Sequence, residues 1–218
     1  MNSENQYALA TDIGGTNIRV ALVDLSGSIL NRYSTKTLPD KEIGDVMSRW
    51  IDALKHVMSF VDREEVLGLG VAFAGPVNYQ TGVLYNPPHL SKWDGLSPKS
   101  ILEEALALDV KISNDASLAA FGEYLFGAGR GFKNMVLLTL GTGIGGGIVT
   151  EGNLYVGHRG FAGEIGHTVI DRNGPLCDCG IRGCFQSMCS GTAIARIANE
   201  RLFSNKCTVL RDEVSGQN

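Results

Sequence analysis

The chain has 218 residues, of which 44% are apolar and 19% are charged, so it is long enough for one large globular domain or two small ones. Its net charge of −4 argues against a nucleic-acid partner, because such proteins usually present a basic face. No apolar run approaches the roughly 20 residues that cross a bilayer, and the start MNSENQYALATDIGG lacks the features of a signal peptide, so we expect a cytoplasmic protein with no membrane partner.

Strands alternate with helices along the chain, which favours α/β layers around mixed sheets. Apolar residues recur at steps of three and four from Ile43 to Val61, which predicts a helix whose Trp50 belongs to the core. The predicted strands are Tyr7–Ile13, Ile18–Leu25, Ser28–Thr35, Val66–Ala74, Asp109–Ser113, Met135–Leu140 and Ile144–Thr150, and the other predicted helices are Pro98–Leu108, Ala116–Phe126 and Ser190–Phe203.

Two segments of the chain resemble each other, TDIGGTNIRVALVD (Thr11–Asp24) and TLGTGIGGGIVTEG (Thr139–Gly152). Each reads as a strand, a Gly/Thr turn and a second strand. Glycine lets backbone N–H groups approach an anion, and threonine adds hydroxyl donors, so each turn could hold phosphate oxygens. Neither turn has the spacing of a P-loop or a dinucleotide-binding motif. A tight hairpin turn is the alternative for one such segment, but two of them indicate a duplicated phosphate-binding device.

Two aspartates and an asparagine lie at the ends of predicted strands. Asp12 opens the first turn, where it could position a hydrated Mg²⁺ beside phosphates. Asn114 and Asp115 lie where a strand ends and a helix begins, which is the usual place for a functional carboxylate in an α/β layer. The alternative is that these two residues only cap the helix.

A histidine and three cysteines gather in EIGHTVIDRNGPLCDCGIRGC. His167, Cys177, Cys179 and Cys184 form a Cys₃His set, which is typical of a structural zinc site. Glu164 lies three residues before the histidine and could present a polar group to a ligand. The alternative is a set of free or disulfide-bonded cysteines that share a loop by accident.

The order of several motifs resembles the ROK family of bacterial sugar kinases and sugar-responsive repressors. The matching segments are DIGGTNIRVALVD, GVAFAGPVNYQTGVLYNPPHLSKW, SNDASLAAFGEYLFGAG, LGTGIGGGIV, GEIGH and CDCGIRGC. The resemblance covers nearly the whole chain, from about Tyr7 to Arg211. It implies an α/β, actin-like ATPase (ribonuclease H-like) fold, with two domains around a sugar-binding cleft and the second domain incomplete. The implied domains are residues 1–113 and 114–218.

The resemblance also implies roles for individual residues. Asp115 matches the catalytic base, and the matching sugar contacts are Gly75, Pro76, Asn114, Glu164 and His167. Nucleotide-binding positions are Asp12, Gly14, Gly15, Thr16, Asn17 and Arg19 around the first turn, and Thr142, Gly143 and Gly145 around the second. His167 doubles as a zinc ligand with Cys177, Cys179 and Cys184.

The chain departs from the family pattern in three places. Gln186 replaces a glutamate that binds a sugar hydroxyl, so an acceptor oxygen is kept while the charge is lost. His89 replaces an asparagine near the sugar, and it is either a sugar contact or a surface residue beside two prolines. The chain also ends early, before the part that the resemblance expects to supply most of the adenosine pocket.

The implied function is ATP-dependent phosphorylation of a hexose, glucose above all, at the C6 hydroxyl. Magnesium would accompany ATP, zinc would be structural, and the full-length protein would be a homodimer or a homotetramer. Two alternatives stay open: a non-catalytic sugar-binding ROK protein or fragment, and a ROK transcriptional regulator without its DNA-binding domain. Against the second alternative, the first predicted strand begins near Tyr7, which leaves no room for a preceding helix-turn-helix.

Overall fold

The computed structural model describes residues 6–88 and 90–203, and the chain divides into two compact units. The first unit comprises Met1–Met135 and Gly147–Ala162, and the second comprises Val136–Gly146 and Gly163–Asn218. The predicted sugar contact His89 lies outside the described residues. The predicted domain boundary between residues 113 and 114 remains a prediction.

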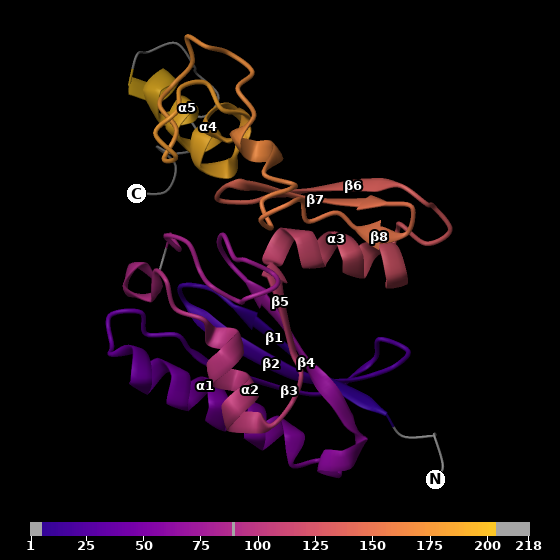
Figure 1. The fold of residues 1–218 in the computed structure, drawn as a ribbon. Helices are drawn as coiled ribbons and strands as arrows, with labels where there is room; N and C mark the ends of the chain where they lie inside the picture. The colour runs from indigo at the N-terminus through magenta and orange to yellow at the C-terminus, as the bar shows by residue number, and fades with distance from the viewer. Residues whose placement is uncertain (1–5, 89, 204–218) are drawn as a thin grey trace, which may run out of the picture. The chain divides into compact units, whose positions relative to one another are not determined.

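A five-stranded mixed sheet forms the centre of the first unit (Figure 1). Its strands are β1 (Tyr7–Ile13), β2 (Asn17–Asp24), β3 (Ile29–Lys36), β4 (Val66–Phe73) and β5 (Val110–Asn114). They lie in the order β3-β2-β1-β4-β5. β2 pairs antiparallel with both β1 and β3, whereas β1, β4 and β5 are parallel. The observed bounds agree with the predicted strands to within one residue at each end.

Alternate residues of β1 and β2 are buried, as the period of two along a strand requires. In β1 the buried positions are Leu9, Thr11 and Ile13. Helices α1 (Ile43–Met58) and α2 (Pro98–Leu106) contact each other and the sheet, and they cover this face. Trp50 of α1 is fully buried, and its indole N–H donates to the Thr11 hydroxyl at 3.2 Å. The prediction that this tryptophan belongs to the core is therefore confirmed.

Helix α3 (Asp115–Phe126) follows β5 directly, and a second, three-stranded sheet follows it along the chain. That sheet has the order β6 (Met135–Leu140), β7 (Ile144–Thr150) and β8 (Asn153–Leu154). A side chain at Gly147 of β7 would overlap with Ala120 of α3 and lie 2.8 Å from the Ala116 carbonyl oxygen. The glycine in this strand is therefore needed for close helix–strand packing.

The remaining helices are divided between the two units. They are η1 (Arg63–Glu65) and η2 (Ser91–Trp93) in the first unit, and η3 (Ile165–His167), α4 (Phe185–Cys189) and α5 (Gly191–Phe203) in the second. The predicted helix Ser190–Phe203 corresponds to α5, and the Ser190 hydroxyl accepts a hydrogen bond from the backbone N–H of Ala193 at 3.2 Å. Over residues 6–88 and 90–203, no helix has both the length and the apolar character that a membrane span requires.

Candidate functional site

The carboxyl ends of the three parallel strands meet at one edge of the sheet. Ile13 at the end of β1 pairs with Phe73 of β4, which pairs with Asn114 of β5. Asp12 lies one residue before this row, and Asp115 lies one residue after it. Open α/β sheets bind ligands outside the carboxyl ends of their strands. The structure therefore brings Asp12, Asn114 and Asp115 to the edge where a ligand site is expected.

The side chains of Asn114 and Asp115 play different parts at the start of α3. Asn114 is the N-cap, and its side-chain oxygen accepts a hydrogen bond from the backbone N–H of Ser117 at 3.1 Å. Asp115 is the first helical residue, and one of its carboxylate oxygens accepts from the N–H of Ala116 at 2.8 Å. Asn114 thus caps the helix, and the half-buried Asp115 carboxylate is also hydrogen-bonded to the Asn114 side chain.

The environment of Asp115 disfavours its charged form. Burial raises the pKa of this carboxyl, and the negative charge of Asp12 raises it further. Hydrogen bonds from backbone N–H groups act in the opposite direction but do not cancel these effects. A carboxylate with a raised pKa is a stronger base, which is the property that a general base needs near neutral pH.

This arrangement makes a prediction for the titration of Asp115. The carboxyl should titrate above the ordinary aspartate value of 3.8, as followed by NMR of its side-chain carbon. In Asp12→Asn the midpoint should fall, because a neighbouring negative charge is removed and the Arg19 charge becomes unpaired. An Asp115 midpoint at or below the ordinary value, or one that does not fall in Asp12→Asn, would contradict the prediction.

Asp12 also forms the one ion pair at this edge among the described residues. Its carboxylate accepts a hydrogen bond from the Arg19 guanidinium at 2.7 Å, across the β1–β2 register. Both side chains are exposed, at 46% for Asp12 and 63% for Arg19. The Asp12 carboxylate is therefore accessible to a hydrated cation, and oxygen ligands are the kind that Mg²⁺ prefers.

The first glycine turn, residues 14–17, is held by a residue that the sequence motifs did not indicate. Within the turn, the N–H of Gly14 donates to the Asn17 carbonyl at 3.1 Å. From outside the turn, the Thr37 hydroxyl donates to the Gly14 carbonyl at 2.7 Å, and the Thr37 N–H donates to the Thr16 carbonyl at 3.0 Å. Thr37 lies just after β3 and far from the turn in sequence, so no local pattern pointed to it.

The second glycine turn, residues 141–143, belongs to the second unit and is held in a similar way. The N–H of Gly191 donates to the Gly141 carbonyl, and the Thr192 hydroxyl donates to the Thr142 carbonyl, both at 2.8 Å. The Gln186 side-chain oxygen accepts a hydrogen bond from the N–H of Ile144 at 2.9 Å. The side-chain oxygen of Gln186 therefore holds this turn, while its NH₂ group makes no hydrogen bond in residues 6–88 and 90–203.

The predicted sugar loop starts at Gly75, immediately after β4. Gly75 has a φ of +152°, and a side chain there would lie 3.2 Å from both Phe73 and Pro88. The carbonyl of Pro76 accepts a hydrogen bond from the N–H of Tyr85 at 3.0 Å. The segment therefore folds back on itself in a fixed conformation, and only glycine suits its first position.

The Cys₃His set predicted from the sequence is assembled in the second unit. The ligand atoms of His167, Cys177, Cys179 and Cys184 all lie within 4.8 Å of one another. The sulfur atoms of Cys179 and Cys184 are 3.6 Å apart, and Cys177 Sγ is 3.7 Å from His167 Nδ1. A tetrahedral zinc ion with Zn–S bonds near 2.3 Å would hold its sulfur ligands about 3.8 Å apart, so the four side chains fit such an ion.

The backbone brings these four residues together. Cys177 and Gly180 close a turn through the N–H of Gly180, which donates to the Cys177 carbonyl at 2.9 Å. Gly183 has a φ of +74°, and a side chain there would overlap with the Asp171 carbonyl. Burial and the neighbouring thiols raise the pKa of Cys184 to about 12. A bound Zn²⁺ would reverse this preference, because a coordinating thiol is deprotonated outright.

The two ring nitrogens of His167 face different groups. Nδ1 lies toward the cysteine cluster, 3.7 Å from Cys177 Sγ, whereas Nε2 lies 3.8 Å from a carboxylate oxygen of Glu164. One nitrogen can therefore bind a metal while the other faces the polar side of the loop. The sequence prediction of a double role for His167 is stereochemically possible.

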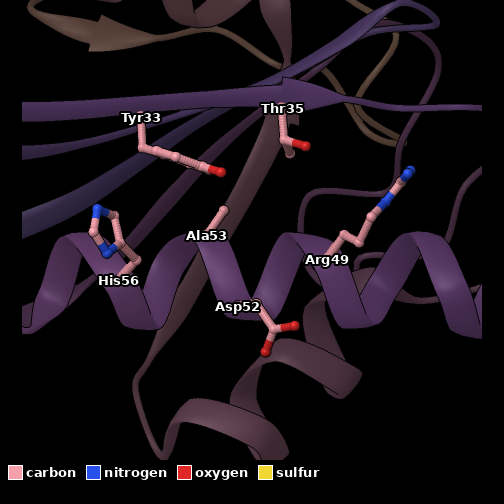
Figure 2. Close-up of a pocket in the computed structure, with 6 residues that line it drawn as sticks. All are labelled: Tyr33, Thr35, Arg49, Asp52, Ala53 and His56. Atoms are coloured by element: carbon pink, nitrogen blue, oxygen red, sulfur yellow. The ribbon is translucent and has the colours of Figure 1, made fainter.

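A hollow of about 400 Å³ lies elsewhere in the first unit, between β3 and α1. Figure 2 shows the side chains that line it, which are Tyr33, Thr35, Arg49, Asp52, Ala53 and His56. None of them is a predicted site residue. The hollow is thus separate from the predicted chemistry, although Arg49 contacts the carbonyl of Thr37 through a 2.6 Å hydrogen bond.

Comparison with known proteins identifies a family. Residues 8–213 match the profile of the ROK family. A glucokinase from Halalkalibacterium halodurans is 38% identical over 205 residues, which cover 93% of this chain and 62% of that protein. A xylose repressor from Bacillus subtilis is 33% identical over 199 residues, which cover 89% of this chain and 50% of the repressor. The chain thus spans about three fifths of the length of the glucokinase that it matches.

A solved structure shows the same fold. It is that of a ROK family glucokinase from Streptomyces griseus in complex with glucose and AMPPNP, and it is 34% identical to this chain. The superposition covers 91% of this chain and 62% of the glucokinase, with a TM-score of 0.76. The predicted actin-like α/β fold is therefore confirmed.

Proposed function

The chain belongs to the ROK family, and we propose on this premise that it phosphorylates a hexose, with glucose as the preferred sugar, C6 as the acceptor position and ATP as the donor. The observation that carries the proposal is the position of Asp115. Its carboxyl has a raised pKa and lies at the same edge of the sheet as the first glycine turn. Similarity to glucokinases supports the choice of sugar and donor. The predicted roles of the individual residues are part of this proposal.

In the proposed mechanism Asp115 takes the proton of the sugar hydroxyl. The hydroxyl oxygen forms a bond to the γ-phosphorus of ATP, the bond from that phosphorus to the bridging oxygen breaks, and ADP leaves with the electron pair. Phosphoryl transfer depends mostly on positioning and charge stabilisation, so the N–H groups of the two glycine turns would bind the phosphate oxygens. Magnesium, which accompanies ATP, would neutralise phosphate charge and would be held near Asp12.

The second unit is proposed to contribute hydroxyl contacts. Glu164 offers carboxylate oxygens, Gln186 offers its NH₂ group, and His167 offers Nε2. Zinc bound at Nδ1 of His167 would leave Nε2 protonated, so that the ring donates a hydrogen bond. Because four protein ligands leave no open position, the zinc would stabilise the loop rather than take part in the reaction.

A panel of hexoses with ATP tests the proposal, with ADP release followed in a coupled assay on the full-length gene product. We expect turnover with glucose above that with mannose or N-acetylmannosamine. The competing function is a sugar-binding regulator, which the similarity to a xylose repressor favours. Tight binding of a sugar in calorimetry, without ADP release at any ATP concentration, would support that function instead.

Residue 186 provides a prediction about affinity. Gln186→Glu should lower the KM for the best hexose several-fold, because a charge-assisted hydrogen bond exceeds a neutral one by about 1 kcal/mol. One carboxylate oxygen can still accept the hydrogen bond from Ile144 that Gln186 accepts now. Gln6→Glu, the same change at an exposed position, should leave KM unchanged. An unchanged or higher KM in Gln186→Glu would remove residue 186 from the sugar contacts.

A further inference from the structure

The hydroxyl, N–H and carbonyl groups of Thr37 all form hydrogen bonds, although none of the sequence motifs includes this residue. The residue is fully buried. Its hydroxyl donates to the Gly14 carbonyl at 2.7 Å, its N–H donates to the Thr16 carbonyl at 3.0 Å, and its own carbonyl accepts from Arg49 at 2.6 Å. A buried threonine with three hydrogen bonds to one turn and one helix has a single accessible conformation.

These bonds decide which polar groups the first glycine turn can offer to a ligand. The carbonyls of Gly14 and Thr16 are both occupied by Thr37. The N–H groups of Gly15 and Thr16, in contrast, donate to no group in the described part of the chain. Carbonyl oxygens repel an anion and N–H groups attract it, so a turn with its carbonyls bound from behind is suited to anion binding.

The second glycine turn shows the same device built from different residues. Its carbonyls at Gly141 and Thr142 are bound by the N–H of Gly191 and the hydroxyl of Thr192. The N–H groups of Thr142 and Gly143 find no acceptor among residues 6–88 and 90–203. Because the two turns lie in different units, the recurrence is not a consequence of shared local packing.

We propose that Thr37 is a positioning residue for binding of the phosphoryl donor. It holds the carbonyls of the first glycine turn back, so that the N–H groups of Gly15 and Thr16 face the phosphates. The proposal rests on the proposed kinase function for the identity of the anion. It can be tested separately from that function, because tripolyphosphate serves as the probe and the measurement needs neither sugar nor turnover.

The first measurement uses the unsubstituted 218-residue chain. Tripolyphosphate is added in an amide NMR titration, and the Gly15 and Thr16 resonances should shift with one common Kd. Thr37→Val keeps the shape of the side chain but removes its hydroxyl. This variant should raise the Kd for tripolyphosphate about tenfold, because the Gly14 carbonyl is no longer held back and the N–H donors of the turn lose their orientation. Thr37→Ser keeps the hydroxyl and should restore binding to within about twofold of the unsubstituted chain.

The matched control is Thr35→Val, since Thr35 lies near the end of β3 and two residues before Thr37 (Figure 2), and its hydroxyl makes no hydrogen bond in the described residues. Its Kd should equal that of the unsubstituted chain. If Thr37→Val does not fold, Thr37→Ala takes its place. Equal Kd values for the Thr37 variants and the unsubstituted chain, absent shifts at Gly15 and Thr16, or equal losses in Thr35→Val would overturn the proposal. A chain that binds tripolyphosphate as expected but phosphorylates no hexose would overturn the kinase function alone.

Discussion

Asp115→Asn should lower the kcat for hexose phosphorylation by about 10² to 10⁴, which is the usual loss when a general base is removed. Asparagine has the same shape and can still accept the hydrogen bond from the N–H of Ala116. It cannot take a proton, so the barrier to transfer rises while weak sugar binding remains. The measurement is kcat of the full-length gene product at saturating hexose and ATP, together with the Kd for the sugar in calorimetry.

Stability separates this catalytic role from a structural one. Because the pKa of Asp115 is raised in the folded protein, the folded state binds a proton more readily than the unfolded chain does. The free energy of unfolding therefore falls as pH rises from the ordinary aspartate value through the raised one. Asp115→Asn removes this unfavourable ionisation and should leave the protein at least as stable as before at neutral pH.

The matched control is Asp45→Asn, the same change at an exposed position in the first turn of α1. It should leave both kcat and the Kd for sugar unchanged. Near-normal turnover in Asp115→Asn would remove Asp115 from its proposed role. A large loss of stability in that variant would show that the carboxylate is needed for folding rather than for proton transfer.

Periodicity made most of the fold predictable. The buried positions of β1 and the apolar face of α1 follow periods of two and of three to four, because each element turns one side toward a shared core. The short α4 was missed, since five residues cannot show a helical period. The sequence also could not indicate why a glycine is needed at position 147, which is that α3 passes close to β7 there.

Site residues were predictable where chemistry restricts the residue type. Three cysteines and a histidine in one loop leave few alternatives to a metal site, and the four ligand atoms do converge. Residues that act through common hydrogen bonds carry no such signal. Thr37 and Thr192 are ordinary threonines in the sequence, and only the positions of the turn carbonyls single them out. The same holds for the bond from Ile144 to Gln186, which joins residues far apart along the chain.

Cys179→Ser should reduce bound zinc from one ion per chain to almost none and should abolish sugar binding. A serine hydroxyl is a poor zinc ligand, so the ion would keep three ligands instead of four. In a loop of this kind the free energy of zinc binding also stabilises the folded conformation. This loop depends on it because Leu176 and Ile181 are exposed and supply no buried apolar contact. Without the ion, the segment that holds Glu164 and His167 should lose its conformation. Metal analysis of protein purified without chelator, with calorimetry for sugar binding, measures both effects.

Cys189→Ser is the matched control, because Cys189 is exposed and lies outside the cluster. It should keep the metal and the affinity for sugar. Limited proteolysis with trypsin adds a readout of the loop itself, since Arg172 and Arg182 are exposed. Cleavage at these arginines should accelerate in Cys179→Ser, and in the unsubstituted protein after chelation, but not in Cys189→Ser. If the unsubstituted protein holds no stoichiometric zinc, the metal site is wrong. If Cys179→Ser loses its zinc yet still binds sugar, the ion is not what holds Glu164 and His167 in place.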